Sequence, residues 1–120
     1  ALKTGASIKE FTACPVYYSG KTSGAHEWLV EFEKLPDSID RFKLELDEEL
    51  KRQNSDYEAK RYKDLVLRMP ILHVAPNGTF YNWLRSKEKL GGQHKVPRLS
   101  NGRVIFEQIS AYCGVQAITS

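Results

Sequence analysis

Residues 26–33 read HEWLVEFE, a stretch in which apolar and polar side chains alternate well. Its apolar side chains recur at alternate positions, which places three of them on one face of a β-strand: Trp28, Val30 and Phe32. Upstream, residues 7–18 are rich in β-branched and aromatic side chains, and Pro15 within them indicates an edge strand or a bulge. Residues 19–24 have the composition of a turn. We therefore predict an antiparallel hairpin.

A helix is predicted after the hairpin, because Pro36 and the Asp37-Ser38 pair supply a start signal. Apolar residues then recur on one helical face: Ile39, Phe42, Leu46 and Leu50. The carboxylates from Asp37 to Glu49 are interpreted as a mostly solvated face. Glu48 precedes Arg52 by four residues, a spacing that favours an ion pair on the same face.

The elements predicted downstream are shorter. Residues 54–56 begin a helical turn that carries Tyr57, Arg61 and Leu65, and a strand bounded by prolines follows at 69–76. A helix then runs from a Thr79 cap to Gly91-Gly92 and carries Phe80, Trp83 and Leu84. The last element is a terminal helix at 104–112. The resulting order β-β-α-α-β-α-loop-α is typical of a single α+β domain. We expect a small mixed sheet packed with helices, as a two-layer or three-layer sandwich.

Composition favours one folded domain. The 120 residues suffice for a core without metal or disulfide support, and a net charge of +3 is too small to indicate a nucleic-acid binder. Cys14 and Cys113 form no disulfide framework, which favours a reducing, cytoplasmic setting. No apolar run approaches the roughly 18 residues of a membrane span, so we expect no membrane partner.

The residues offer few candidates for chemistry. In the loop 91–98, two glycines precede Lys95 and Arg98, a pair of cations suited to a phosphate or carboxylate, although a helix stop with solvated charges explains the same residues. The turn at 77–79 is either a helix cap or an anion site, and the cap is favoured. The histidines share no ligand spacing, so no metal site is expected, and His73 is interpreted as a hydrogen-bonded, half-buried side chain. Trp28 and Trp83 are assigned to the core rather than to base stacking.

Four stretches occur in an order that points to one family: Gly24-Ala25-His26-Glu27-Trp28, Asn54-Ser55-Asp56-Tyr57 with Arg61, Asn77-Gly78-Thr79-Phe80, and Gln93-His94-Lys95-Val96-Pro97-Arg98. Together they resemble the C-terminal domain of the Gretchen Hagen family of acyl acid–amido synthetases, which belong to the adenylate-forming superfamily. The likeness runs from about Ser7 to Arg103, and residues 57–61 and 95–101 resemble the bacterial branch.

This resemblance implies a two-domain, ATP-dependent ligase that forms carbon–nitrogen bonds. A large N-terminal adenylation domain would bind ATP with Mg²⁺ and a carboxylic acid and form an acyl-adenylate. The C-terminal domain would then change its orientation, and an amine or amino acid would take the acyl group. Residues 1–120 correspond to this mobile C-terminal lid, and Ala1 to Gly5 read as the last turn of a helix begun upstream. We therefore expect a fragment that is not active alone.

The resemblance also assigns roles within the loop. Lys95 is expected to be the catalytic lysine that neutralises phosphate charge, and Gln93 and Arg98 to shape the loop or contact the nucleotide. His94 departs from the plant pattern, in which an aromatic residue is often found. Two alternatives remain: a non-enzymatic module that binds RNA or another polyanion through the basic residues 85–103, and a protein-interaction domain that uses the edge at 7–18.

Overall fold

A computed structural model describes residues 6–17, 24–62, 67–89, 98 and 103–115. Its elements are β1 (Ser7–Tyr17), β2 (Gly24–Lys34), α1 (Ile39–Gln53), α2 (Ser55–Arg61), β3 (Ile71–Ala75), α3 (Thr79–Lys89) and α4 (Val104–Cys113). The predicted α+β class and the order of elements are confirmed. The predicted turn before Gly24, the contribution of Leu65 and the helix stop at Gly91-Gly92 lie outside the described residues.

The sheet is mixed and has the order β1-β2-β3. β1 and β2 form the predicted antiparallel hairpin, with Ala13 opposite Trp28. β3 runs parallel to β2, with His73 opposite Leu29. β2 is therefore the central strand, and Pro15 lies in an edge strand, where a residue without an N–H group is tolerated.

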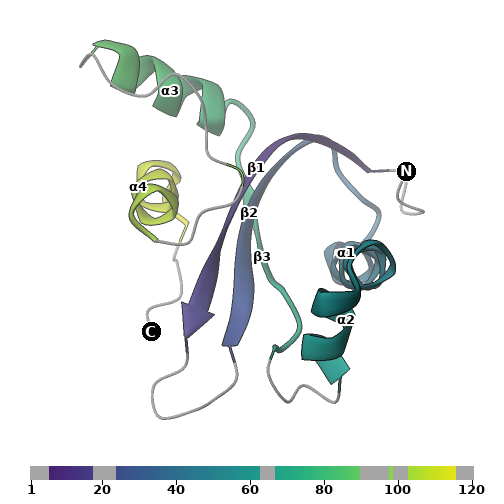
Figure 1. Cartoon of the computed structure of the whole chain (residues 1–120). Coiled ribbons are helices and arrows are strands. Elements are labelled where there is room, and N and C mark those ends of the chain that lie inside the picture. The colour runs from purple at the N-terminus through teal and green to yellow at the C-terminus, as the bar shows by residue number, and fades with distance from the viewer. Residues whose placement is uncertain (1–5, 18–23, 63–66, 90–97, 99–102, 116–120) are drawn as a thin grey trace.

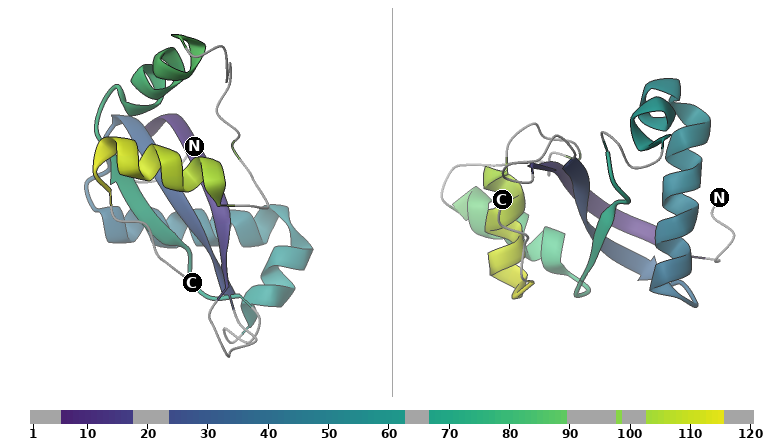
Figure 2. Two further views of the ribbon diagram at one scale, coloured as in Figure 1. Left: turned by 90° about the vertical axis from the view of Figure 1, so that its left-hand side faces the viewer. Right: turned by 90° about the horizontal axis from the view of Figure 1, so that it is seen from below.

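Helices cover both faces of the sheet, so the fold is the three-layer form of the predicted sandwich. Figures 1 and 2 show α1 and α2 on one side of the strands and α3 and α4 on the other. One core contains the predicted apolar face of β2 together with Phe42 of α1, and Phe32 meets that ring edge-on at 4.9 Å. The second core contains Leu29, Phe80, Trp83, Phe106 and Ile109.

The start of α1 follows the sequence prediction, but its charged face does not. The Ser38 side chain accepts a hydrogen bond from the Arg41 N–H at 3.2 Å, as an N-cap does. Arg52 pairs with Glu49 rather than with the predicted Glu48. The interpretation of the helix carboxylates as solvated is wrong for Asp47, which is 2 % exposed.

Asp47 is buried because α2 folds back against α1 and supplies partners for the carboxylate. The Tyr57 hydroxyl donates to it at 2.6 Å, and the Arg61 guanidinium donates through two nitrogens at 2.7 Å each. Asn54 caps α2 by accepting hydrogen bonds from the N–H groups of Asp56 and Tyr57. Two residues of the second family stretch, Tyr57 and Arg61, therefore fasten α2 to α1, and a third, Asn54, caps α2.

Candidate functional site

Arg98 ends the stretch in which the catalytic lysine was predicted, and three contacts fix it to the edge of the sheet. Its carbonyl oxygen accepts a hydrogen bond from the Ala13 N–H at 2.8 Å. Its Nε donates to Glu10 at 3.0 Å, and its guanidinium lies 5.5 Å from the centre of the Phe11 ring. Because β1 is an edge strand, the backbone bond also satisfies a donor that the sheet leaves open. Arg98 is thus attached to β1 through both its backbone and its side chain.

The other two predicted site residues, Lys95 and Gln93, lie outside the described residues. Arg98 follows Lys95 by three positions, so the described attachment to β1 lies three residues after the lysine in the sequence.

A second arginine holds the chain just before α4. The Nη2 of Arg103 donates to Glu27 Oε1 at 2.8 Å, and its Nη1 donates to the Pro15 carbonyl oxygen at 2.9 Å and to the Cys14 sulfur at 3.2 Å. Burial would by itself lower the pKa of Arg103, but the hydrogen bond to Glu27, the charges of Cys14 and Glu27 and the hydrogen bond to Glu107 together outweigh burial and raise that pKa. Arg103 therefore stays charged and binds to both strands of the hairpin.

Glu27 is fully buried and uses both carboxylate oxygens. Arg103 occupies one oxygen, and the Nε2 of His73 lies 2.5 Å from the other. The interpretation of His73 as hydrogen-bonded and half-buried is confirmed, since its side chain is 18 % exposed. The role of Glu27 was missed because an alternating strand suggests a solvated polar face. No local signal was available, because the burial of Glu27 depends on β3 and on Arg103, which are distant from it in the chain.

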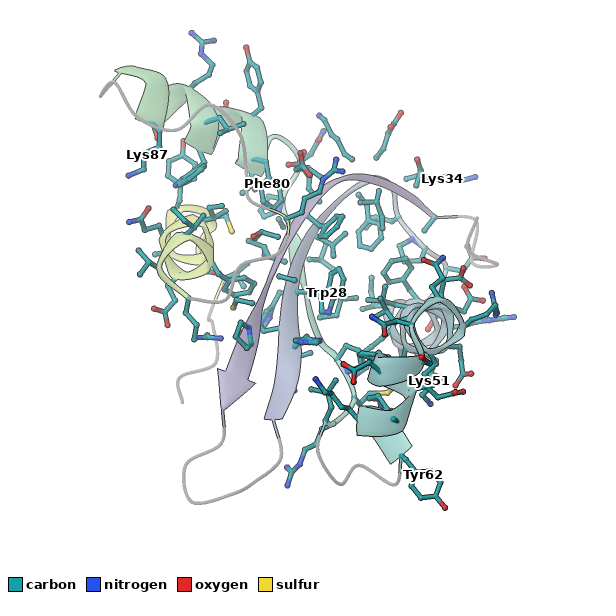
Figure 3. All side chains as sticks on the ribbon, in the orientation of Figure 1. Trp28, Lys34, Lys51, Tyr62, Phe80 and Lys87 are labelled. Carbon is teal, nitrogen blue, oxygen red and sulfur yellow. The ribbon has the colours of Figure 1, made fainter. Side chains whose placement is uncertain are left out.

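Glu31 is the second buried carboxylate of β2, and it holds the start of α3. Its oxygens accept hydrogen bonds from the N–H groups of Gly78 at 2.8 Å and Phe80 at 3.1 Å, and the Lys9 ammonium lies 3.6 Å away. Figure 3 shows Phe80 at the beginning of α3. The predicted Thr79 cap is wrong, because the Thr79 hydroxyl donates to the Pro76 carbonyl oxygen. The anion at this helix end is the protein's own carboxylate.

A separate cavity of about 310 Å³ opens between the hairpin and α2. His26 lines it and stacks on Tyr57 with ring centres 6.2 Å apart. Burial, together with the nearby Lys60 charge, lowers the pKa of His26, so its imidazole is neutral at pH 7. The cavity lies on the side of the sheet that carries α2. Two charged residues that line it, Lys60 and Asp56, form an ion pair with each other at 3.1 Å.

The described part of the basic stretch 85–103 does not form a row of free cations. Arg98 and Arg103 pair with glutamates, the Arg85 guanidinium lies 5.8 Å from the Tyr81 ring, and the Lys87 ammonium lies 5.8 Å from the Trp83 ring. The two tryptophans are core residues as predicted, with Trp28 8 % and Trp83 2 % exposed.

Within residues 6–17, 24–62, 67–89, 98 and 103–115, no helix is both long and apolar enough for a membrane span. In the same residues, no three His, Cys, Asp or Glu side chains gather in a group suited to a metal ion.

Comparison with known proteins identifies relatives of this fold. The model of the GH3 family C-terminal domain matches residues 1–104. Two solved structures resemble the chain: a GH3.15 acyl acid amido synthetase (TM-score 0.64, 18% identity, 88% of this chain) and AtGH3.15 acyl acid amido synthetase in complex with 2,4-DB (TM-score 0.67, 16% identity, 89% of this chain). The chain spans 20% of the length of each. No curated protein matches it.

Proposed function

The chain belongs to the GH3 C-terminal domain family, the Gretchen Hagen family expected from its motifs, and we propose that it is the mobile C-terminal domain of an ATP-dependent acyl acid–amido synthetase. In this proposal the N-terminal domain of the same parent chain binds the carboxylic acid and ATP. The acid becomes an acyl-adenylate, and an amine or amino acid then takes the acyl group. The parent is bacterial and cytoplasmic, which rests on the residue patterns at 57–61 and 95–101 and on the two free cysteines.

Lys95 is the residue that we propose to act on the nucleotide. Attack on the α-phosphate and departure of pyrophosphate both concentrate negative charge, and a positioned cation stabilises that charge as it develops. At about 4 Å and an effective dielectric near 20, one ammonium contributes about 4 kcal/mol. Its loss would therefore slow adenylation by about a thousandfold.

The observation that carries this proposal is the anchoring of Arg98 on β1. A loop that delivers a charge to a partner domain needs a fixed point from which it is presented, and Arg98 supplies one three residues after Lys95 through its contacts to Glu10, Phe11 and Ala13. Arg98 is assigned to loop shape, and Gln93 to loop shape or nucleotide contact. Mg²⁺, like ATP, is proposed to be held mainly by the N-terminal domain.

The test is the Lys95→Ala variant of the full-length parent, assayed by ATP–pyrophosphate exchange. We expect a loss of about a thousandfold with an unchanged melting temperature. Lys87→Ala is the matched control, because this lysine belongs to the same basic stretch but lies over the Trp83 ring. Exchange at the parental rate in Lys95→Ala would remove the lysine from the mechanism.

A further inference from the structure

The cavity between the hairpin and α2 has no part in the proposed adenylation, and its size suits a small ligand. Its volume of about 310 Å³ is at the lower end of the range of small-molecule sites. In Figure 1, α2 lies level with the end of the hairpin at which β1 ends and β2 begins. The apolar part of the lining comes from Pro15, Val16, Ala25 and Leu67. Val16 and Ala25 are each 1 % exposed, so this part of the cavity has packed walls.

Two stacked rings also line the cavity, and neither brings a charge into it. The rings of His26 and Tyr57 are 6.2 Å apart and inclined by only 17°. The Tyr57 hydroxyl donates to Asp47 at 2.6 Å, so Tyr57 offers its ring to the cavity rather than a free hydroxyl. His26 is neutral at pH 7, because burial and the Lys60 charge lower its pKa. The interior of the cavity is therefore uncharged.

The charged groups of the lining lie on α2 and form one ion pair. The Lys60 Nζ lies 3.1 Å from the Asp56 carboxylate, and the two side chains are 51 % and 74 % exposed. An exposed pair of this kind contributes little to stability, so a ligand separates the two side chains at small cost. A ligand with a single charge would be attracted by one side chain and repelled by the other. A zwitterion satisfies both.

We infer that this cavity binds an α-amino acid with an apolar side chain of about the size of leucine. The carboxylate of the amino acid pairs with Lys60, and its ammonium group pairs with Asp56. Its side chain enters the apolar part of the cavity, beside Ala25 and Leu67. The inference does not depend on the role of Lys95, because binding requires neither ATP nor adenylation.

The experiment is a titration of the ¹⁵N-labelled 120-residue chain with L-leucine, followed through the amide chemical shifts of His26 and Lys60. The amide of Phe106 is the internal reference, because α4 lies on the opposite side of the sheet from α2. Three analogues are titrated in parallel. 4-Methylpentanoate lacks the ammonium group, 3-methylbutylamine lacks the carboxylate, and glycine lacks the apolar side chain.

We expect L-leucine to cause saturable shifts at His26 and Lys60 at millimolar concentrations, and none at Phe106. Each analogue with a single charge should bind about fivefold more weakly than leucine, because one charge of the ion pair is left facing a like charge or an apolar group. Glycine should bind more than about tenfold more weakly, because it buries no apolar side chain.

Variants that remove one charge of the pair should change the preference between these ligands. Asp56→Asn should bind 4-methylpentanoate at least as tightly as leucine, and Lys60→Gln should do the same with 3-methylbutylamine. Glu45→Gln is the matched control, because it removes one charge of the Arg41–Glu45 pair, which also spans four positions but lies on α1 and outside the cavity lining. It should keep the preferences of the unaltered chain. Asp56 and Lys60 are both exposed by more than half, so their variants should also keep its melting temperature.

Three results would each overturn the inference. The first is the absence of a saturable shift at His26 and Lys60 up to about 10 mM leucine. The second is equal affinity of the unaltered chain for leucine and either single-charge analogue, which would indicate an unselective apolar cavity. The third is the same order of ligand preference in Asp56→Asn and Lys60→Gln as in Glu45→Gln. Exchange by Lys95→Ala tests the proposed function separately, so either proposal can fail without the other.

Discussion

Glu27, Glu31 and Asp47 are each at most 2 % exposed, and each has charged or backbone donors around its carboxylate. Removing one partner of a buried ion pair costs about 3–5 kcal/mol, because the remaining charge is left unpaired. An exposed pair such as Arg41–Glu45, in which the arginine is 69% exposed, contributes only about 0.2–1 kcal/mol. Each of the three buried carboxylates therefore contributes more to the stability of the described part of the domain than an exposed pair such as Arg41–Glu45 does.

The hydrogen bond between Asp47 and Tyr57 shifts their pKa values in opposite directions: it lowers that of the carboxyl group and raises that of the phenol. Burial would raise the pKa of Asp47, but its hydrogen bonds from Arg61 and Tyr57, together with the charges of Arg61 and Lys51, outweigh burial and lower it. Burial raises the pKa of Tyr57, and the bond to Asp47 raises it further. The pair therefore stays as carboxylate and neutral phenol at pH 7, and α2 stays attached to α1.

His26 should make the free energy of unfolding depend on pH, and this dependence can be measured separately from that of the carboxylates. Burial first, and then the Lys60 charge, lowers its pKa below 6.5 in the folded chain. The unfolded chain then binds more protons at this site, so stability is fully present above pH 6.5 and is lost as the pH falls through the lower, folded pKa. Between pH 7.5 and 5.5, protonation of His26 in the unfolded chain should lower the free energy of unfolding by up to about 1 kcal/mol.

The measurement is urea unfolding of the chain and of His26→Phe at these two pH values. Phenylalanine keeps an aromatic ring against Tyr57 but does not titrate. We expect the free energy of unfolding to fall less with acidification in the variant. Equal losses in the two proteins would show that His26 is not responsible.

At the scale of elements, α3 depends on a side chain from another element for its first hydrogen bonds. The N–H groups at the start of a helix have no partner within it, and Glu31 supplies two acceptor oxygens to Gly78 and Phe80. Glu31→Gln keeps the shape of the side chain but replaces one acceptor oxygen of the carboxylate with an NH2 group, which is a donor. We therefore expect faster hydrogen exchange of the Gly78 and Phe80 amides, by about tenfold for a loss of 1.4 kcal/mol.

The amide of Arg41 is the internal reference for this exchange experiment, because it bonds to the Ser38 cap of α1, and α1 lies on the opposite side of the sheet from α3. Its exchange rate should be the same in the variant and the parent. Unchanged rates at Gly78 and Phe80 would mean that the carboxylate does not hold the start of α3.

The elements themselves could be predicted from sequence, because each depends on a local pattern. Alternation revealed the face of Trp28, and Ser38 and helical spacing revealed α1. Glu27, Glu31 and Asp47 could not be found in this way, because their burial depends on elements distant in the chain. Glu27 meets Arg103 across 76 positions, and no local pattern indicates such a pair. The role of Lys95 came from the family resemblance and stays a prediction.

At the scale of the whole molecule, the domain has two cores on either side of one three-stranded sheet. The face with α1 and α2 is fastened by Asp47, which binds Arg61 of α2. On the face with α3 and α4, Glu27 binds Arg103 just before α4 and Glu31 binds the backbone at the start of α3. Each face is therefore held by buried carboxylates of its own.

The same arrangement predicts what the isolated chain does. Two of the six basic side chains in the stretch 85–103, Arg98 and Arg103, are paired with glutamates within the domain, which leaves fewer cations to hold a nucleotide or an RNA strand. Since the acid and ATP sites are proposed to lie in the N-terminal domain, we expect the 120-residue chain to show no ATP–pyrophosphate exchange. Calorimetry should detect at most weak ATP binding, and a sub-micromolar complex would contradict this. Affinity for single-stranded RNA should be low across a salt titration, whereas strong binding that falls steeply with salt would favour a polyanion-binding module instead.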